Sequence, residues 1–127
     1  MTPQEIVDRL RREHDDARVV AEALEGATAD TAGGVAELFL EFFDDFSWDH
    51  FPTEEATLLP ALPRDDDGLA LAERVRVEHA SLRVRATALR KASDDDPGAL
   101  RELGVLLSEH LELEESELFG RIADVRG

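Results

Sequence analysis

Apolar residues recur at spacings of three and four along almost the whole chain. This spacing places them on one side of an α-helix, whereas a half-buried β-strand needs a strict alternation of polar and apolar residues that no segment sustains. The apolar stripes cover residues 6–24, 35–61, 72–89 and 100–122. Four long helices with short connections favour a bundle. We therefore predict an all-α fold, an antiparallel up-down-up-down four-helix bundle, with residues 1–127 forming a single domain.

The ends of the expected helices carry residues that commonly begin a helix. Thr2 can cap the first helix with Pro3 at its first position, and Asp96 and Pro97 repeat this arrangement before the fourth stripe. Pro52 lies inside the second stripe and removes one backbone N–H. We expect it to kink the chain or to restart the helix close to that point.

Composition limits the partners of such a bundle. With 14 basic and 30 acidic residues, the formal net charge is −16, which repels nucleic acid and anionic lipid and favours cations. The chain has no cysteine, so disulfides, thiolate metal sites and iron–sulfur clusters are excluded. It also has no uninterrupted apolar run near 18 residues and no signal-peptide pattern. We expect a cytoplasmic monomer or homodimer with no nucleic-acid or membrane partner.

All four histidines of the chain lie on the apolar stripes, one in each expected helix. A single core histidine is ordinary, but four would all fall on stripes covering about three of seven helix positions roughly 3% of the time. At about 1.5 Å per residue, all four lie at a depth of roughly 17 to 21 Å from one end of the bundle. We therefore predict that one layer of the core contains His14, His50, His79 and His110.

Two glutamates share these stripes. Glu54 follows His50 by four residues, and Glu114 follows His110 by four, so the imidazole and the carboxylate of each pair point the same way. A bare carboxylate in a core costs several kcal/mol unless it is paired or coordinated. Imidazoles and carboxylates together suit first-row transition ions. The predicted metal ligands are His14, His50, Glu54, His79, His110 and Glu114.

A pair of ions uses these six side chains better than one ion does. A single octahedral ion would be saturated, whereas two bridging glutamates would give each of two ions two imidazoles and two carboxylate oxygens. A solvent-derived oxo or hydroxo bridge would make each ion five-coordinate, with one position open for a small ligand. Zinc and manganese accept the same ligands, so the donor set alone leaves the metal open.

These residues and the segment from His50 to Leu62, HFPTEEATLLPAL, resemble the hemerythrin-like family, whose domains are often described as His-His-Glu cation-binding domains. The resemblance extends from His14 to Glu114, with the helices in the expected order. It implies a four-helix bundle with a non-heme centre of two iron ions that binds dioxygen or related small molecules. In that family the equivalents of the four histidines ligate iron, and those of Glu54 and Glu114 bridge.

The chain departs from the oxygen-carrying members of that family at two places. Those members have a second histidine on the third helix, four residues from the first, but here Val75 and Arg83 flank His79 at that distance. They also place an aspartate five residues after the last histidine. Here Glu115 has that spacing but would point about 140° away from that histidine, so we select Glu114 as the ligand. The missing imidazole favours peroxide turnover, solvent exchange or iron sensing over reversible oxygen carriage.

Residues beside the histidines offer weaker signals. A residue next to a histidine in sequence points about 100° off the stripe, so the acids preceding the histidines are expected to be mainly solvated, with a minority accepting imidazole N–H groups. We expect Trp48 to pack at a helix interface, and the phenylalanines of residues 39–46 to lie in the core, where they would also suit a small apolar ligand. The preceding acids are Glu13, Asp49, Glu78 and Glu109.

Three functions remain open at this point. The first is a non-heme di-iron protein that binds or reacts with dioxygen, peroxide or nitric oxide. The second is an iron-responsive sensor or metal-binding module without turnover. The third is a metal-free structural bundle whose histidines pair with glutamates.

Overall fold

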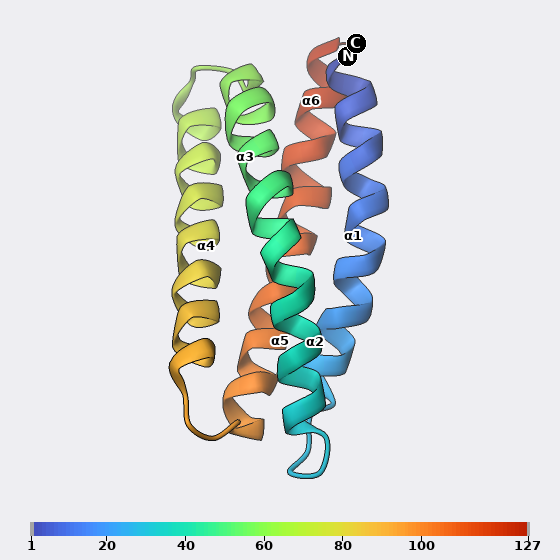
Figure 1. Cartoon of the computed structure of the whole chain (residues 1–127). Coiled ribbons are helices and arrows are strands. Elements are labelled where there is room, and N and C mark those ends of the chain that lie inside the picture. Colours follow the sequence, from blue (N-terminus) through green and yellow to red (C-terminus); the bar gives the residue numbers. More distant parts are fainter. Residues whose placement is uncertain (1, 127) are drawn as a thin grey trace.

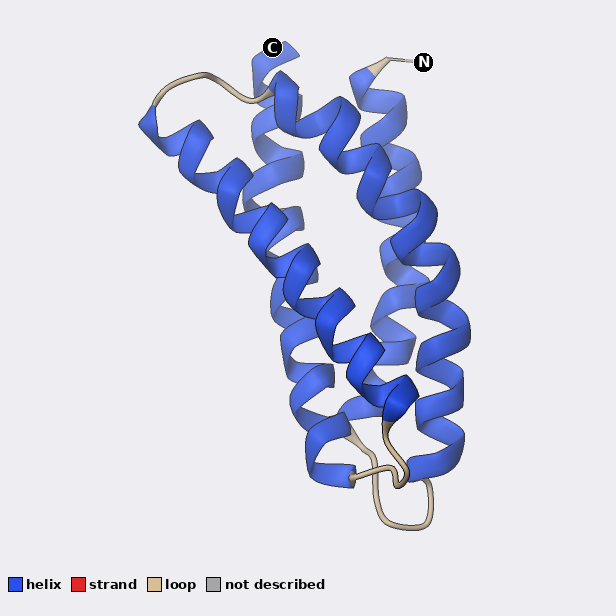
Figure 2. Cartoon of the chain, turned by 60° about the vertical axis from the view of Figure 1, so that its left-hand side comes forward, coloured by secondary structure: helices blue, strands red, loops and turns tan. Residues whose placement is uncertain are grey.

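The computed structural model describes residues 2–126, and these form four helical rods that lie side by side (Figure 1). The predicted all-α four-helix bundle is confirmed, and no strand occurs within residues 2–126 (Figure 2). In this range no helix combines the length and the apolar character needed to cross a bilayer. The first rod is α1 (Pro3–Glu25), the second runs through α2 (Ala32–Asp45), η1 (Phe46–His50), α3 (Phe51–Thr53), η2 (Glu54–Leu58) and η3 (Leu59–Ala61), the third is α4 (Asp66–Lys91), and the fourth comprises α5 (Pro97–Leu113), η4 (Glu114–Leu118) and α6 (Phe119–Arg126).

Successive rods run in opposite directions, as the colours of Figure 1 show. The two ends of the chain lie at the same end of the bundle as the connection between the second and third rods. The loops before α2 and before α5 lie at the other end. Residues at similar distances from one end of the bundle therefore meet, although they are far apart in the sequence.

The predicted starts of the first and last rods are confirmed. Thr2 and Asp96 each cap a helix through a side-chain oxygen that accepts a backbone N–H, and a proline opens each helix. The α4 helix begins earlier than the sequence indicated. Asp65 caps it, so Asp66 and Asp67 lie in its first turn. Their negative charges stabilise the helix there by interacting with the positive end of its dipole.

The second rod continues through Pro52 instead of restarting beside it. In the π-helical turn η1, Phe51 donates its backbone N–H to the carbonyl of Phe46, five residues earlier. A second π turn, η2, begins at Glu54 directly after the short α3 segment. Such widened turns let a helix pass a residue that has no N–H to donate. Of the two outcomes expected for Pro52, the restart near residue 50 does not occur, because the chain stays helical there.

Two apolar clusters fill the bundle, and a polar layer separates them. On α1, His14 lies between Leu10 of one cluster and Ala17 of the other. On α4, His79 separates Val75 from Leu82 in the same way. The helical periodicity therefore continues through the layer, and only the chemistry of the buried side chains changes there.

Candidate metal centre

The six side chains predicted as ligands lie together in this layer, which we call the histidine layer. None of them is more than 1% exposed, and all four rods contribute to it. They form two groups of four whose donor atoms lie within 4.8 Å of one another. The groups are His14, His50, Glu54 and Glu114, and Glu54, His79, His110 and Glu114.

Glu114 lies among three histidines. Its Oε1 is 3.0 Å from Nε2 of His14, and its Oε2 is 3.3 Å from Nε2 of His79 and 3.0 Å from Nε2 of His110. The contacts with His14 and His79 have hydrogen-bond geometry. The Glu114 carboxylate therefore joins both groups of four, one oxygen to each side.

Glu54 lies beside two histidines at similar distances but makes no hydrogen bond with them. Its Oε1 is 3.1 Å from Nε2 of His79, and its Oε2 is 3.3 Å from Nε2 of His50. Within the described residues neither oxygen has a hydrogen-bond partner, and neither does Nε2 of His110. Buried polar atoms without partners cost about 1–3 kcal/mol each. Buried oxygen and nitrogen atoms that converge without hydrogen-bond partners suit a cation, so these side chains fit a metal site.

The side chains of the layer also shift one another's pKa values. Burial and the nearby charge of Glu114 raise the pKa of Glu54 well above its ordinary value of 4.5. Burial would also raise the pKa of Glu114, but contacts with His110 and other histidines outweigh it, and that pKa lies well below 4.5. Burial opposes protonation of His110, yet Glu114 and Glu78 raise its pKa to about 9. The two carboxylates of the layer therefore differ, because Glu54 binds a proton much more readily than Glu114 does.

On its other side, each histidine directs Nδ1 to a glutamate that lies outside the layer. Burial would raise the pKa of Glu13 and Glu78, but their hydrogen bonds lower it overall, so both are ionised and can only accept. The imidazoles of His50 and His110 therefore donate from Nδ1, and Nδ1 of His79 and of His14 faces a glutamate in the same way. The pairs are His50 with Glu13 at 2.9 Å, His79 with Glu55 at 2.8 Å, His110 with Glu78 at 2.8 Å, and His14 with Glu115 at 3.3 Å.

Only two of the four acids that precede a histidine take part in these pairs. Glu13 and Glu78 each accept a hydrogen bond from a histidine on another rod, whereas Asp49 pairs with Arg9. Sequence reasoning missed the other two acceptors, Glu55 and Glu115. The signal that could have found them is a repeat: the pattern His-x3-Glu-Glu-x2-Leu occurs twice, beginning at residues 50 and 110.

Aromatic rings cover the histidine layer. The ring of Phe46 stacks on His50 with centroids 4.0 Å apart, and the ring of Phe51 stacks on His79 at 3.8 Å. The placement of Phe46 in the core is as predicted, since it is 6% exposed. The expectation for Trp48 is wrong: it is 84% exposed, because it lies on the side of its helix opposite His50 and faces solvent.

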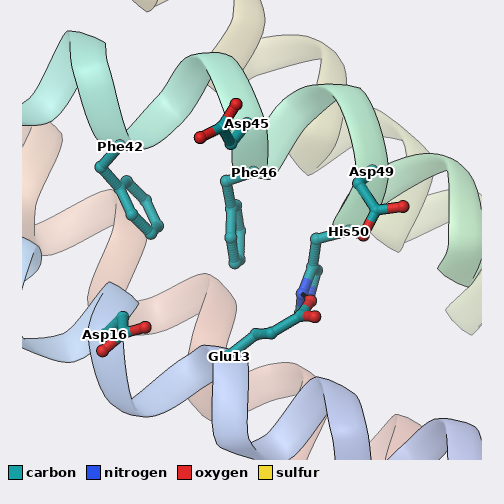
Figure 3. Close-up of a pocket in the computed structure, with 7 residues that line it drawn as sticks. All are labelled: Glu13, Asp16, Phe42, Asp45, Phe46, Asp49 and His50. Atoms are coloured by element: carbon teal, nitrogen blue, oxygen red, sulfur yellow. Dashed lines mark hydrogen bonds and ion pairs between the residues drawn. The ribbon is translucent and has the colours of Figure 1, made fainter.

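A surface cavity of about 270 Å³ approaches the layer beside His50 (Figure 3). In this view the His50 ring and the Glu13 carboxylate point toward each other, with Phe46 next to them. A smaller cavity of about 70 Å³ lies beside His110. The larger cavity is lined by Glu13, Asp16, Phe42, Asp45, Phe46, Asp49 and His50. On the His50 side, solvent therefore approaches the layer through a mainly acidic cavity.

Neither of the residues four positions from His79 can serve as a fifth imidazole ligand. Val75 is fully buried in an apolar cluster. The guanidinium of Arg83 lies over the ring of Phe51, 5.2 Å from its centroid, and 3.7 Å from the carboxylate of Glu55. Arg83 thus contacts the glutamate that holds His79 and does not add a ligand to the layer.

Four histidines and two glutamates, buried together with unpartnered donor atoms, define a metal-binding four-helix bundle. The model of the Hemerythrin HHE cation binding domain matches residues 5–122. The chain belongs to this family, as the sequence resemblance indicated. Comparisons with curated proteins and with solved structures found no match.

Proposed function

We propose that the chain holds two iron ions in the histidine layer and binds or reacts with dioxygen, peroxide or nitric oxide there. The observation that carries this proposal is the sharing of donors. Glu54 and Glu114 belong to both groups of four, while each group has two histidines of its own. Shared carboxylates suit two bridged ions, and imidazole with carboxylate suits iron, although zinc and manganese accept the same donors.

In this proposal each side chain of the layer has a defined task. The histidines bind through Nε2, because Nδ1 already donates a hydrogen bond to a glutamate. Glu54 and Glu114, which belong to both groups of four, would be shared between the two ions. Phe46 and Phe51 stack on two of the rings and limit their rotation.

The environment of the layer suits a small ligand of low polarity. When bound, a pair of iron ions supplies redox chemistry and coordination positions for such a ligand. The chain leaves positions available because Arg83, and not an imidazole, follows His79 by four residues. Buried phenylalanines keep the surroundings dry, which favours dioxygen, hydrogen peroxide or nitric oxide over larger, charged substrates.

The metal content of the purified protein tests this proposal directly. Protein produced with ample iron and purified in air should contain about two iron ions per chain and absorb near-ultraviolet light through ligand-to-iron charge transfer, which a reductant removes. Glu109→Gln, which changes an exposed acid next to His110, should match the parent protein. Stoichiometric zinc or manganese, or one ion per chain, would contradict the proposal of two irons.

A sensor without turnover is the second candidate, and one observation favours it. Every rod contributes at least one of the proposed ligands, so metal occupancy would alter how firmly all four rods are held together. Peroxide decay separates the two candidates. Saturable consumption far above that of free iron supports a reacting centre, whereas no consumption by fully loaded protein supports a sensor.

Metal binding near neutral pH should release protons. His110 has a pKa of about 9 in the metal-free protein, so it carries a proton at pH 7 that must leave before Nε2 can bind a cation. The raised pKa of Glu54 acts in the same direction. One proton released makes the apparent affinity rise about tenfold per pH unit from pH 7 toward pH 9.

Calorimetry can measure this release. Zinc is titrated into metal-free protein at pH 7 in buffers of different ionisation enthalpy, and the slope of heat against that enthalpy gives the number of protons. We expect at least about one proton per chain beyond those released by the metal solution itself. A slope of zero would show that the layer is already deprotonated.

A further inference from the structure

Outside the histidine layer, the glutamates that accept from Nδ1 form a closed ring around the bundle. We call them the outer glutamates. Each contacts a histidine of the next rod, so the hydrogen bonds pass from the first rod to the second, third and fourth and back to the first. The outer glutamates are Glu13 on α1, Glu55 on η2, Glu78 on α4 and Glu115 on η4, and they hold His50, His79, His110 and His14, respectively.

Every outer glutamate also contacts an arginine. Arg9 lies 2.9 Å from Glu13, and Arg74 lies 3.1 Å from Glu78, each four residues earlier on the same helix. Across neighbouring rods, Arg83 is 3.7 Å from Glu55, and Arg18 pairs closely with Glu115. Four arginine–glutamate–histidine chains therefore run from the surface to the layer. Along them exposure falls, from 26–33% for the glutamates to at most 1% for the histidines.

The two halves of the molecule build these chains in the same way. Arginine, glutamate, histidine and arginine occur at residues 9, 13, 14 and 18, and with the same intervals at residues 74, 78, 79 and 83. The pair of adjacent glutamates after His50 recurs after His110. Both halves use the first glutamate of the pair inside the layer and the second one outside it. A chance surface contact would not recur at four matched positions.

We propose that the four outer glutamates are positioning residues for the metal centre. Neutral imidazole can carry its proton on either nitrogen, and only the form with the proton on Nδ1 presents a free lone pair at Nε2. An ionised glutamate at Nδ1 selects that form and fixes the plane of the ring. The arginine keeps the glutamate in place. This inference rests on the proposed function only in that the histidines bind a cation.

The sequence supplies a matched control. Glu109 precedes His110 just as Glu13 and Glu78 precede His14 and His79, and it carries the same charge. In residues 2–126, however, Glu109 makes no hydrogen bond or ion pair with a histidine. A variant at Glu109 therefore removes one acid near the layer without removing a contact to an imidazole.

The test compares Glu78→Gln, Glu55→Gln and Glu109→Gln with the parent protein, with Co²⁺ as the probe. We expect the first two to weaken Co²⁺ affinity by about 10- to 100-fold and to change its visible ligand-field spectrum, with Glu109→Gln close to the parent. Long-range proton–nitrogen spectra of the metal-free proteins give the second readout. In spectra recorded at a pH high enough for the imidazoles to be neutral, the Nδ1–H form of His110 should decline in Glu78→Gln, and that of His79 in Glu55→Gln.

The results separate this inference from the proposed function. If the parent protein binds no Co²⁺, the metal site itself is wrong. If it binds Co²⁺ and all three variants match it in affinity, spectrum and tautomer, the outer glutamates do not position the histidines. Circular dichroism of each metal-free variant identifies a folding defect, and the tautomer measurement on the other folded variant then decides the question.

Discussion

Replacing Glu54 with leucine is expected to stabilise the metal-free protein while preventing it from holding two metal ions. Both oxygens of Glu54 are buried without a hydrogen-bond partner in the described residues, and leucine fills a similar volume without polar atoms. Removing an unsatisfied buried group returns about 1–3 kcal/mol. The melting temperature of the metal-free variant should rise by about 3 to 10 °C.

Glu114→Leu is the matched comparison, because it makes the same change at the equivalent position of the repeat. Nε2 of His14 and Nε2 of His79 lie within hydrogen-bonding distance of the Glu114 carboxylate, so its loss leaves buried imidazole nitrogens without partners. We expect this variant to lose about 1–3 kcal/mol of metal-free stability. Thermal melts in the presence of a chelator give the stability, and elemental analysis should show fewer than two ions in both variants. A metal-free Glu54→Leu protein less stable than the parent would contradict the prediction.

Glu54→Leu and Glu114→Leu are expected to change metal-free stability in opposite directions, and this difference reflects how the layer is built. The histidines around Glu114 lower its pKa, whereas burial and the nearby charge of Glu114 raise the pKa of Glu54. A buried ion pair optimised for the metal-free fold would leave neither glutamate unpartnered. The residues of the layer thus reduce the stability of the empty bundle in order to bind a cation.

The rods and the depth of the layer follow from local geometry, and for this reason the sequence predicts them. The spacing of apolar residues determines which side of a helix is buried, and a constant rise per residue determines height. His14, His50, His79 and His110 required only these two quantities to be placed together. These two quantities do not predict which imidazole nitrogen is free to bind a metal. That depends on the residues that approach Nδ1 from other rods.

Contacts between a glutamate on one rod and Nδ1 on another depend on how the two rods are rotated about their axes. The apolar stripe of a single helix does not give this rotation. Glu13 and Asp49 have the same position relative to a histidine, yet Glu13 reaches His50 and Asp49 meets Arg9. The π turns that begin at Glu54 and Glu114 further change the direction of the following residues. An angle of about 100° per residue therefore fails just where Glu55 and Glu115 turn toward their histidines.

Removing the metal should lower the thermal stability of the loaded protein by a large amount. A ligand that binds only the folded state at 100 times its dissociation constant adds about 2.7 kcal/mol for each site, so two ions add about 5 kcal/mol. All four rods contribute side chains to the layer, so unfolding any rod breaks the site. For a chain of this length, we expect treatment with a strong chelator to lower the melting temperature by about 10 to 20 °C.

The same measurement on Glu54→Leu provides the control, because a variant that does not hold two ions should lose much less stability on chelation. The order of the two melting temperatures should therefore reverse on chelation. The parent melts at the higher temperature when loaded, and the variant melts at the higher temperature when both are metal-free. Chelation without effect on the parent protein would instead support a structural bundle whose histidines pair with glutamates. The reversal of order depends on both the unpartnered oxygens of Glu54 and the cation that they would bind, so neither feature alone would produce it.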